Sequence, residues 1–214
     1  MGLDLLTACS INGVLSPARS LAGLGLIEAL GVPPNIVELH RGMRRRYDAV
    51  LAGPNTVLLD NPPLTSHAAP GFTCVRATLD PAGKIPPDYR FLDGSVRTLI
   101  GVSRATPKSY LQLLAERGVE ALRCGESRVD LRSFVEAMAA RGLGRVLVEG
   151  GGRLNRALLD QQLVEQIHLL LMPVVLDSGA VNAFEGRPDP LRKLRLAEAS
   201  RLDDFLLLRY SVHS

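Results

Sequence analysis

The chain has 214 residues, 46% of them hydrophobic and 22% charged, so it is long and apolar enough to bury the core of one large domain. A net charge of +3 with only 4% aromatic residues argues against a nucleic-acid-binding protein, which needs more basic charge and more stacking side chains. No apolar run approaches the roughly 20 residues that span a bilayer, which argues against a membrane protein.

Short apolar runs alternate with amphipathic stretches, and this order predicts an α/β fold with a mostly parallel central sheet flanked by helices. We expect strands at residues 3–9, 48–53, 73–79, 97–102, 119–124, 145–148 and 165–172. We expect helices at residues 35–46, 106–118, 130–142 and 152–159. Two C-terminal strands, 194–199 and 205–212, flank the turn-forming pair Asp203-Asp204 and are expected to run antiparallel.

Particular residues mark the helix starts and one buried helix face. Asn35 is expected to cap the first helix, with Glu38 completing a capping-box pattern. Thr106 followed by Pro107 predicts the start of the second helix, and Asp130 the cap of the third. Helical spacing predicts the buried stripe of that third helix, which comprises Leu131, Phe134, Val135 and Met138.

The cysteines and histidines indicate neither a disulfide framework nor a metal site. Cys9, Cys74 and Cys124 lie far apart and form no C-x-x-C pair, so we expect core thiols in a reducing, cytoplasmic compartment. The four histidines lack metal-ligand spacing, so we expect no metal. No repeat or long linker interrupts the chain, and we expect residues 1–214 to form a single domain.

Ligands of parallel α/β sheets bind beyond the carboxyl ends of the strands, so the segments that follow strands are the candidate sites. The strongest local signal is a strand that ends at Glu149, a turn built from Gly150, Gly151 and Gly152, and a helix that starts there. Glycines let a phosphate approach the backbone, and the helix N-terminus offers free N–H groups. A tight strand-to-helix turn without a ligand fits the same residues, and local sequence leaves both interpretations open.

Two further segments carry polar side chains with two possible roles each. If the chain after Gly53 is helical, Thr56 and Asp60 share one face and can bind a ligand, although Asp60 can equally end a helix with its carboxylate satisfied. The basic run 44–46 lies near the end of a helix. It is either a solvated face that complements the helix dipole or a source of one arginine that grips a phosphate.

Together these segments resemble the reductase domain of riboflavin biosynthesis, a family with a dihydrofolate-reductase-like fold, over residues 5–185. The matching segments follow the family's order, namely residues 8–13 (A-x-S-L-D-G), 44 with 48–51 (R-x-x-x-D-A-V-L), 53–65 (G-x-x-T-V-x-x-D-x-P-x-L-T), 79–86 (V-D-S-x-x-R-I-P) and 147–165 (L-x-E-G-G-G-x-L-N-x-x-L-L-x-x-x-L-V-D-E). Asn12, His67 and Pro81 depart from the family's Asp, Arg and Ser.

The resemblance assigns roles to individual residues. It implies NADPH contacts by Ala8, Thr56, Asp60, Asp80, Pro81, Ala82, Gly83, Val129, Gly151, Gly152, Arg153 and Leu154. Of these, 80–83 and Val129 would hold the adenosine side and 151–154 the diphosphate. It implies substrate contacts by Arg44, Leu64, His67 and Glu149. Glu149 and Asp60 are the candidate catalytic carboxylates, because ring opening and imine formation both need proton transfers.

The reaction that the resemblance implies is reduction of a ribosylamino-pyrimidine 5′-phosphate to its ribitylamino form, with hydride from NADPH. A reductase of another heterocycle, such as a dihydropterin, and a non-catalytic nucleotide-binding homologue are the alternatives. No deaminase signature (H-x-E with P-C-x-x-C) occurs, so we expect a stand-alone reductase. The Leu-rich strand 205–208 and the resemblance predict a homodimer.

Overall fold

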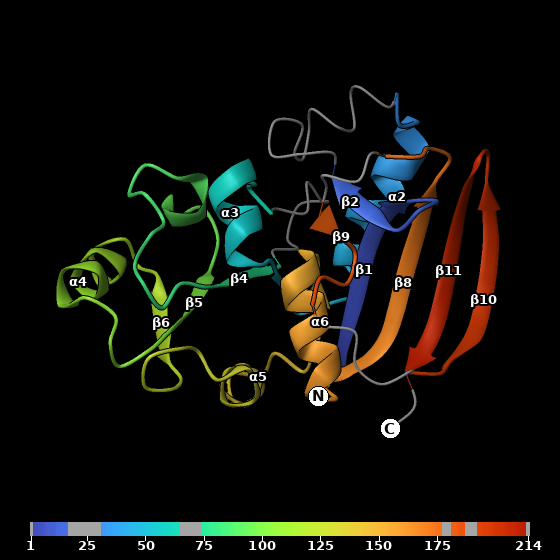
Figure 1. Cartoon of the computed structure of the whole chain (residues 1–214). Helices are drawn as coiled ribbons and strands as arrows, with labels where there is room; N and C mark the ends of the chain where they lie inside the picture. The colour runs from blue at the N-terminus through green and yellow to red at the C-terminus, as the bar shows by residue number, and fades with distance from the viewer. Residues whose placement is uncertain (1, 17–30, 65–73, 177–180, 187–191, 213–214) are drawn as a thin grey trace. The chain divides into compact units, whose positions relative to one another are not determined.

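The structure, a computed structural model, describes residues 2–16, 31–64, 74–176, 181–186 and 192–212. The chain forms two compact units (Figure 1): Val37–Val146 is the first, and Gly2–Ile36 with Leu147–Ser214 is the second. Each unit combines a β-sheet with helices, and the predicted α/β class, with parallel strands and a C-terminal antiparallel pair, is confirmed.

Four parallel strands form the sheet of the first unit, in the order β3 (Ala49–Leu51), β4 (Val75–Leu79), β5 (Thr98–Val102) and β6 (Glu120–Arg123). Every residue of β4 and β5 is buried, as expected for parallel strands covered on both faces. The helices of this unit are α3 (Pro54–Asp60), α4 (Lys108–Glu116) and α5 (Leu131–Ala139), with a short 3-10 helix, η1 (Arg90–Leu92). α3 contacts β4, whereas α4 and α5 contact β6.

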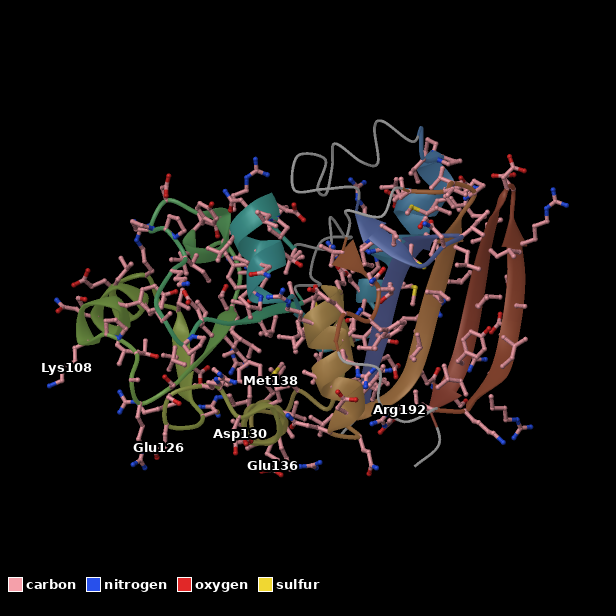
Figure 2. The ribbon with its side chains drawn as sticks, viewed as in Figure 1. Lys108, Glu126, Asp130, Glu136, Met138 and Arg192 are labelled. Atoms are coloured by element: carbon pink, nitrogen blue, oxygen red, sulfur yellow. The ribbon has the colours of Figure 1, made fainter. Side chains whose placement is uncertain are left out.

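Helix α5 has both the cap and the buried face that its sequence predicts. The Asp130 carboxylate accepts a hydrogen bond from the Ser133 N–H (2.7 Å), so the predicted cap is confirmed. The predicted stripe is buried along its whole length. Figure 2 shows Met138 on the inner side of α5 and Glu136 on the outer side. The strand that follows, β7 (Arg145–Val148), has the predicted bounds.

The second unit contains both parallel and antiparallel pairing. β1 (Gly2–Ser10) pairs parallel with β8 (Val164–Met172), β8 pairs antiparallel with β11 (Phe205–Val212), and β11 pairs antiparallel with β10 (Leu194–Leu202). In Figure 1, α6 (Gly152–Asp160) runs beside β1, and β10 forms the outer edge. A two-stranded sheet of β2 (Val14–Ser16) and β9 (Val181–Asn182) was not predicted, because segments of three and two residues are too short to show alternation.

One apolar cluster of the second unit includes Ile36, at the start of helix α2 (Pro34–Arg44). Ile36, in the first turn of α2, packs with Leu170, Met172 and Phe205 from β8 and β11. Partly buried hydrophobic residues complete the cluster, among them Ala8, Leu202 and Leu207. One face of β8 and β11 is thereby covered.

Two predicted helix starts are wrong by one or two residues. α2 begins at Pro34 rather than after a capping Asn35, because a first-turn proline has a suitable φ and loses no helix bond. Glu38 pairs with Arg41 (3.0 Å) rather than closing a capping box. α4 begins at Lys108 with Pro107 as its N-cap, and the Thr106 hydroxyl does not cap it.

One charged side chain is completely buried inside the first unit. Arg76, in β4, is 0% exposed. Its guanidinium donates hydrogen bonds to the hydroxyl of Thr98 (3.1 Å) and to the carbonyls of Pro63 (3.2 Å) and Arg90 (2.8 Å). Nη2 also forms an ion pair with Asp93 (2.9 Å). Because arginine stays charged in proteins, these acceptors replace water, and removing a partner from such a buried network costs about 3–5 kcal/mol.

The ion pair predicts an acid-dependent loss of stability. Partial burial raises the pKa of Asp93, but hydrogen bonds from Ser95 and Arg76 outweigh this effect and lower it to about 2. An unfolded aspartate titrates near a pKa of about 3.9. Ionised Asp93 therefore stabilises the fold fully above about pH 4, and this contribution disappears as the pH falls through about 2.

We expect Asp93→Asn to remove this pH dependence. Its Tm, measured by circular dichroism, will fall less steeply between about pH 4 and pH 2 than that of the wild-type protein, because asparagine does not titrate. Equal slopes for the two proteins would contradict the assignment.

Candidate functional site

Three loops at the carboxyl ends of β4, β5 and β6 form one hydrogen-bonded rim in the first unit. We call residues 80–83, 103–106 and 125–130 the strand-end rim. The Thr106 hydroxyl donates to the Pro81 carbonyl (2.8 Å), which links the first two loops. The N–H groups of Arg104 and Ala105 donate to the carbonyls of Gly125 and Glu126, both at 3.0 Å, which links the second and third. Figure 2 shows Glu126 and Asp130 projecting outward from this part of the unit.

The rim contains the residues assigned to the adenosine side of the cofactor. Asp80 is 4% exposed, and its carboxylate accepts hydrogen bonds from the N–H groups of Lys84 (3.0 Å) and Ile85 (2.9 Å). This carboxylate therefore holds its own loop in shape. Ala82 is exposed, and Val129 is partly buried between β6 and α5. The structure places residues 80–83 just after β4 and Val129 just after β6, and these two strands flank β5. This edge of the sheet is a suitable place for one ligand.

Gly83 is required by its neighbour Tyr110. Gly83 has φ +65°, and an added Cβ would lie 2.8 Å from the Tyr110 ring. Burial raises the pKa of Tyr110, and the neighbouring Asp80 carboxylate raises it further, so this phenol stays protonated. Gly83 and Tyr110 together pack the rim against α4.

Helix α3 presents the predicted pair Thr56 and Asp60. The helix forms as expected after Gly53, with Pro54 in its first turn, and Val57 is its buried residue. Thr56 and Asp60 are both partly buried and lie one turn apart on one face. Asp60 Oδ1 is buried without a hydrogen-bond partner among the described residues. Burial raises the pKa of Asp60, which suits a carboxyl that accepts a hydrogen bond or exchanges a proton.

The residues assigned to the substrate are divided between the units. Arg44 ends α2 and is partly buried, whereas Arg45 and Arg46 are exposed, which distinguishes Arg44 from the rest of the basic run. Leu64 is 3% exposed and has φ +45°. His67 lies outside the described residues. Glu149 follows β7 in the second unit and is partly buried.

The glycine turn of the second unit leads directly into α6. Gly151 is the N-cap with φ −74° and ψ 177°, and no side chain caps the helix. The first N–H groups of α6 are therefore not occupied by a capping side chain, which is the geometry that binds a phosphate. Arg153 is exposed and pairs with Glu185 (2.9 Å), whereas the side chain of Leu154 is buried, so Leu154 offers a ligand only its backbone.

Gly152 has a packing role that the sequence did not reveal. A Cβ at this position would lie 2.0 Å from the Asn182 carbonyl oxygen. The Glu185 N–H also donates to the Gly152 carbonyl (3.1 Å). Gly152 is thus required by the close approach of residues 182–185, whether or not a phosphate binds.

Asn155 was also missed, although an asparagine on the apolar face of a helix is a visible signal. It is fully buried, and Nδ2 donates to the Thr7 hydroxyl and to the Ala183 carbonyl, both at 3.0 Å. It therefore joins α6 to β1 and to the segment after β9. Asn12 has a comparable role, since its side-chain amide donates to the Leu176 carbonyl (2.7 Å) and accepts from the Leu176 N–H (3.2 Å). An aspartate at position 12 could not make both bonds.

Several negative findings concern the described residues only. All three cysteines are buried and free of disulfides, as predicted. No cluster of His, Cys, Asp or Glu in the described ranges has the makings of a metal site. None of the helices that the structure describes has the length and hydropathy needed to cross a membrane.

The strands, helices and strand-end loops define a mixed α/β protein with the fold of solved riboflavin-pathway reductase chains. The pyrimidine reductase-like protein of Corynebacterium diphtheriae superposes with a TM-score of 0.83 at 19% identity, covering 100% of this chain and 92% of its own. RibD of Acinetobacter baumannii superposes with a TM-score of 0.82 at 20% identity, covering 99% of this chain. This chain spans only 58% of that RibD chain.

The chain belongs to the RibD C-terminal domain family, which matches residues 37–208. The 2,5-diamino-6-ribosylamino-4(3H)-pyrimidinone 5′-phosphate reductase of Methanothermobacter thermautotrophicus is 35% identical over 179 residues, which cover 79% of this chain and 82% of that protein. The family resemblance inferred from the motifs is therefore confirmed.

We expect Gly152→Ala to destabilise the protein by about 2–3 kcal/mol, because the new methyl group must displace a backbone carbonyl. Gly42→Ala is the matched control: Gly42 lies within α2 with no atom within 4 Å of an added Cβ. Alanine there is expected to stabilise the helix by about 0.5–1 kcal/mol. Urea denaturation measures both, and a neutral Gly152→Ala would show that residues 182–185 move freely.

Proposed function

We propose that this protein is an NADPH-dependent reductase that converts a ribosylamino-pyrimidine 5′-phosphate to the ribitylamino compound in riboflavin biosynthesis. The observation that carries the proposal is the uncapped, glycine-built start of α6 immediately after Glu149. The name of the Methanothermobacter relative supports the diamino-pyrimidinone as the first substrate to test. We propose that residues 1–214 act as one reductase domain, and the free buried thiols suit a cytoplasmic enzyme.

The residues present fit a nicotinamide dinucleotide. The first N–H groups of α6 would bind the diphosphate at Gly151 to Leu154, with Arg153 adding positive charge at the surface. The buried Oδ1 of Asp60 would accept a hydrogen bond from a ribose hydroxyl, and Thr56 on the same face would provide a second contact. Asp80 to Gly83 and Val129 would hold the adenosine side, and Ala8 would lie near the nicotinamide end.

The chain's own residues would orient the substrate and move protons. Arg44 and His67 would bind its 5′-phosphate, and Leu64, whose side chain is buried, would line the pyrimidine site with its backbone. Glu149 would move the proton of the glycosylamine N–H to the ring oxygen as the ribose opens to the imine, and would then pass a proton from solvent to that nitrogen as C1′ is reduced. When bound, NADPH supplies the hydride that reaches C1′.

We also propose a homodimer formed through one face of β10 and β11. Strand pairing places Leu206, Leu208 and Tyr210 of β11 on this face, beside Leu194 and Leu196 of β10. Leu194, Leu196 and Leu206 are 39%, 52% and 42% exposed. On the opposite face, Phe205, Leu207 and Leu202 pack in the cluster that includes Ile36, and Arg209 forms an ion pair with Glu198. A self-complementary apolar face suits the two-fold contact of two identical chains.

The substrate is identified by following NADPH absorbance with each candidate ribosylamino-pyrimidine 5′-phosphate. Turnover of the diamino-pyrimidinone or of the amino-uracil supports the proposal. The unphosphorylated compound and a dihydropterin are the controls, and equal turnover of either would show that the enzyme reduces another class of heterocycle.

A pair of variants tests the roles of Glu149 and Gly151. We expect Glu149→Gln to lower kcat about 100-fold with little change in NADPH affinity, because it loses proton transfer alone. Gly151→Val is expected to do the reverse, since a branched side chain blocks the phosphate at the start of α6. Calorimetry and steady-state kinetics separate the effects, and parallel losses in both variants would refute these roles.

The dimer is tested by replacing an exposed leucine with a charge. Leu196→Glu is expected to convert a dimer into monomers at micromolar concentration, because it places a carboxylate inside an apolar interface. Leu59→Glu, at a leucine that is 55% exposed on α3, is the matched control and should leave the mass unchanged. Light scattering measures both, and a monomeric wild-type protein would end the proposal.

A further inference from the structure

The exit from α3 contains two left-handed residues that are not glycine. Asn61 has φ 40° and Leu64 has φ 45°, and Pro62 and Pro63 lie between them. The left-handed region is unfavourable for a residue with a Cβ, and more so for leucine than for asparagine. Such residues persist only where their surroundings hold them in place, so this short segment depends on contacts from elsewhere.

Those contacts come from the buried guanidinium of Arg76. Its Nη1 donates to the Pro63 carbonyl (3.2 Å), which belongs to the peptide group that joins Pro63 to Leu64. The same nitrogen donates to the Arg90 carbonyl (2.8 Å), and the Arg90 N–H donates to Asn61 Oδ1 (2.9 Å). Nη1 of Arg76 thus holds the Pro63 side of segment 61–64 directly and the Asn61 side through Arg90.

The guanidinium is itself fixed on its remaining sides. Nε donates to the Thr98 hydroxyl, Nη2 donates to Asp93, and the group lies 5.4 Å from the centroid of the Phe91 ring. Because these bonds share the plane of the guanidinium, they set the direction of Nη1. The side chain is 0% exposed, so it touches no substrate.

We infer that Arg76 is a positioning residue of the substrate site: by orienting the Pro63–Leu64 peptide, it determines where Leu64 meets the substrate. This inference rests on the proposed function, which assigns Leu64 to the pyrimidine phosphate. Arg76 therefore acts on substrate binding from inside the protein, through one carbonyl and one left-handed residue.

Arg76→Met tests the inference, because methionine fills part of the space and donates no hydrogen bond. We expect KM for the ribosylamino-pyrimidine phosphate to rise about tenfold or more, while kcat and KM for NADPH change less than about threefold. Asp93→Asn is the matched control, since its amide oxygen can still accept from Nη2 while the charge is lost, and all three constants should stay within about twofold. A proportional change in all constants, or an unchanged substrate KM in folded Arg76→Met, would overturn the inference.

Arg76→Lys serves if Arg76→Met does not fold. Lysine keeps the charge, but its single nitrogen cannot serve Thr98, Asp93 and both carbonyls at once, so a rise of about threefold in substrate KM is expected. A wild-type KM in this variant would contradict a positioning role.

Hydrogen exchange in the ligand-free protein gives a readout that needs no activity. In either Arg76 variant, the amides of Asn61 and Arg90 are expected to exchange about tenfold faster relative to that of Ile100 in β5, and Asp93→Asn should not show this. Equal acceleration at all three amides would mean that Arg76 affects only general stability. If the wild-type protein reduces no ribosylamino-pyrimidine, the proposed function fails, and hydrogen exchange still decides whether Arg76 holds the segment 61–64.

Discussion

A polar group buried away from water must find its partners within the chain, and the loops around the candidate site are arranged by this constraint. The guanidinium of Arg76 has four acceptors from three segments of the chain. The Asp80 carboxylate holds the turn that follows β4, and Asn155 joins α6 to its neighbours. Each group lies in or just beyond a strand or helix, so the regular elements fix the loops through hydrogen bonds rather than through apolar packing alone.

The regular elements were predictable, because apolar periodicity and capping residues act over short distances. β7 has its predicted bounds, and the stripe from Leu131 to Met138 is buried as expected. The start of α2 was misplaced because a first-turn proline can begin a helix without the polar cap beside it, and that of α4 because the Thr106 hydroxyl bonds to the Pro81 carbonyl and the Ser103 N–H instead. β2 and β9 pair only through residues far apart in sequence, which no local pattern reveals.

The sequence motifs named candidate residues for the site, but not the side chains that hold their loops in place. The motifs named Asp60, Asp80 and the glycine turn, whereas Arg76 and Asn155 were not singled out and Thr106 was expected only to start a helix. An arginine within the apolar run of β4 was a visible signal of a buried network, but its partners at 63, 90, 93 and 98 lie on three other segments of the chain. Such hydrogen bonds join segments that are separate in the chain. In a single sequence, their only trace is an isolated polar residue in an apolar segment.

The close approach at Gly152 changes what the glycine-rich motif means in related chains. The Asn182 carbonyl leaves no room for a Cβ there, so a related chain with the same close approach would need a glycine at that position for its packing. A relative that has lost its cofactor and its activity would still carry it. Retention of Gly152 is therefore a signature of the architecture, and evidence that a relative still binds a dinucleotide must come from positions that folding leaves free to vary, such as the exposed Arg153.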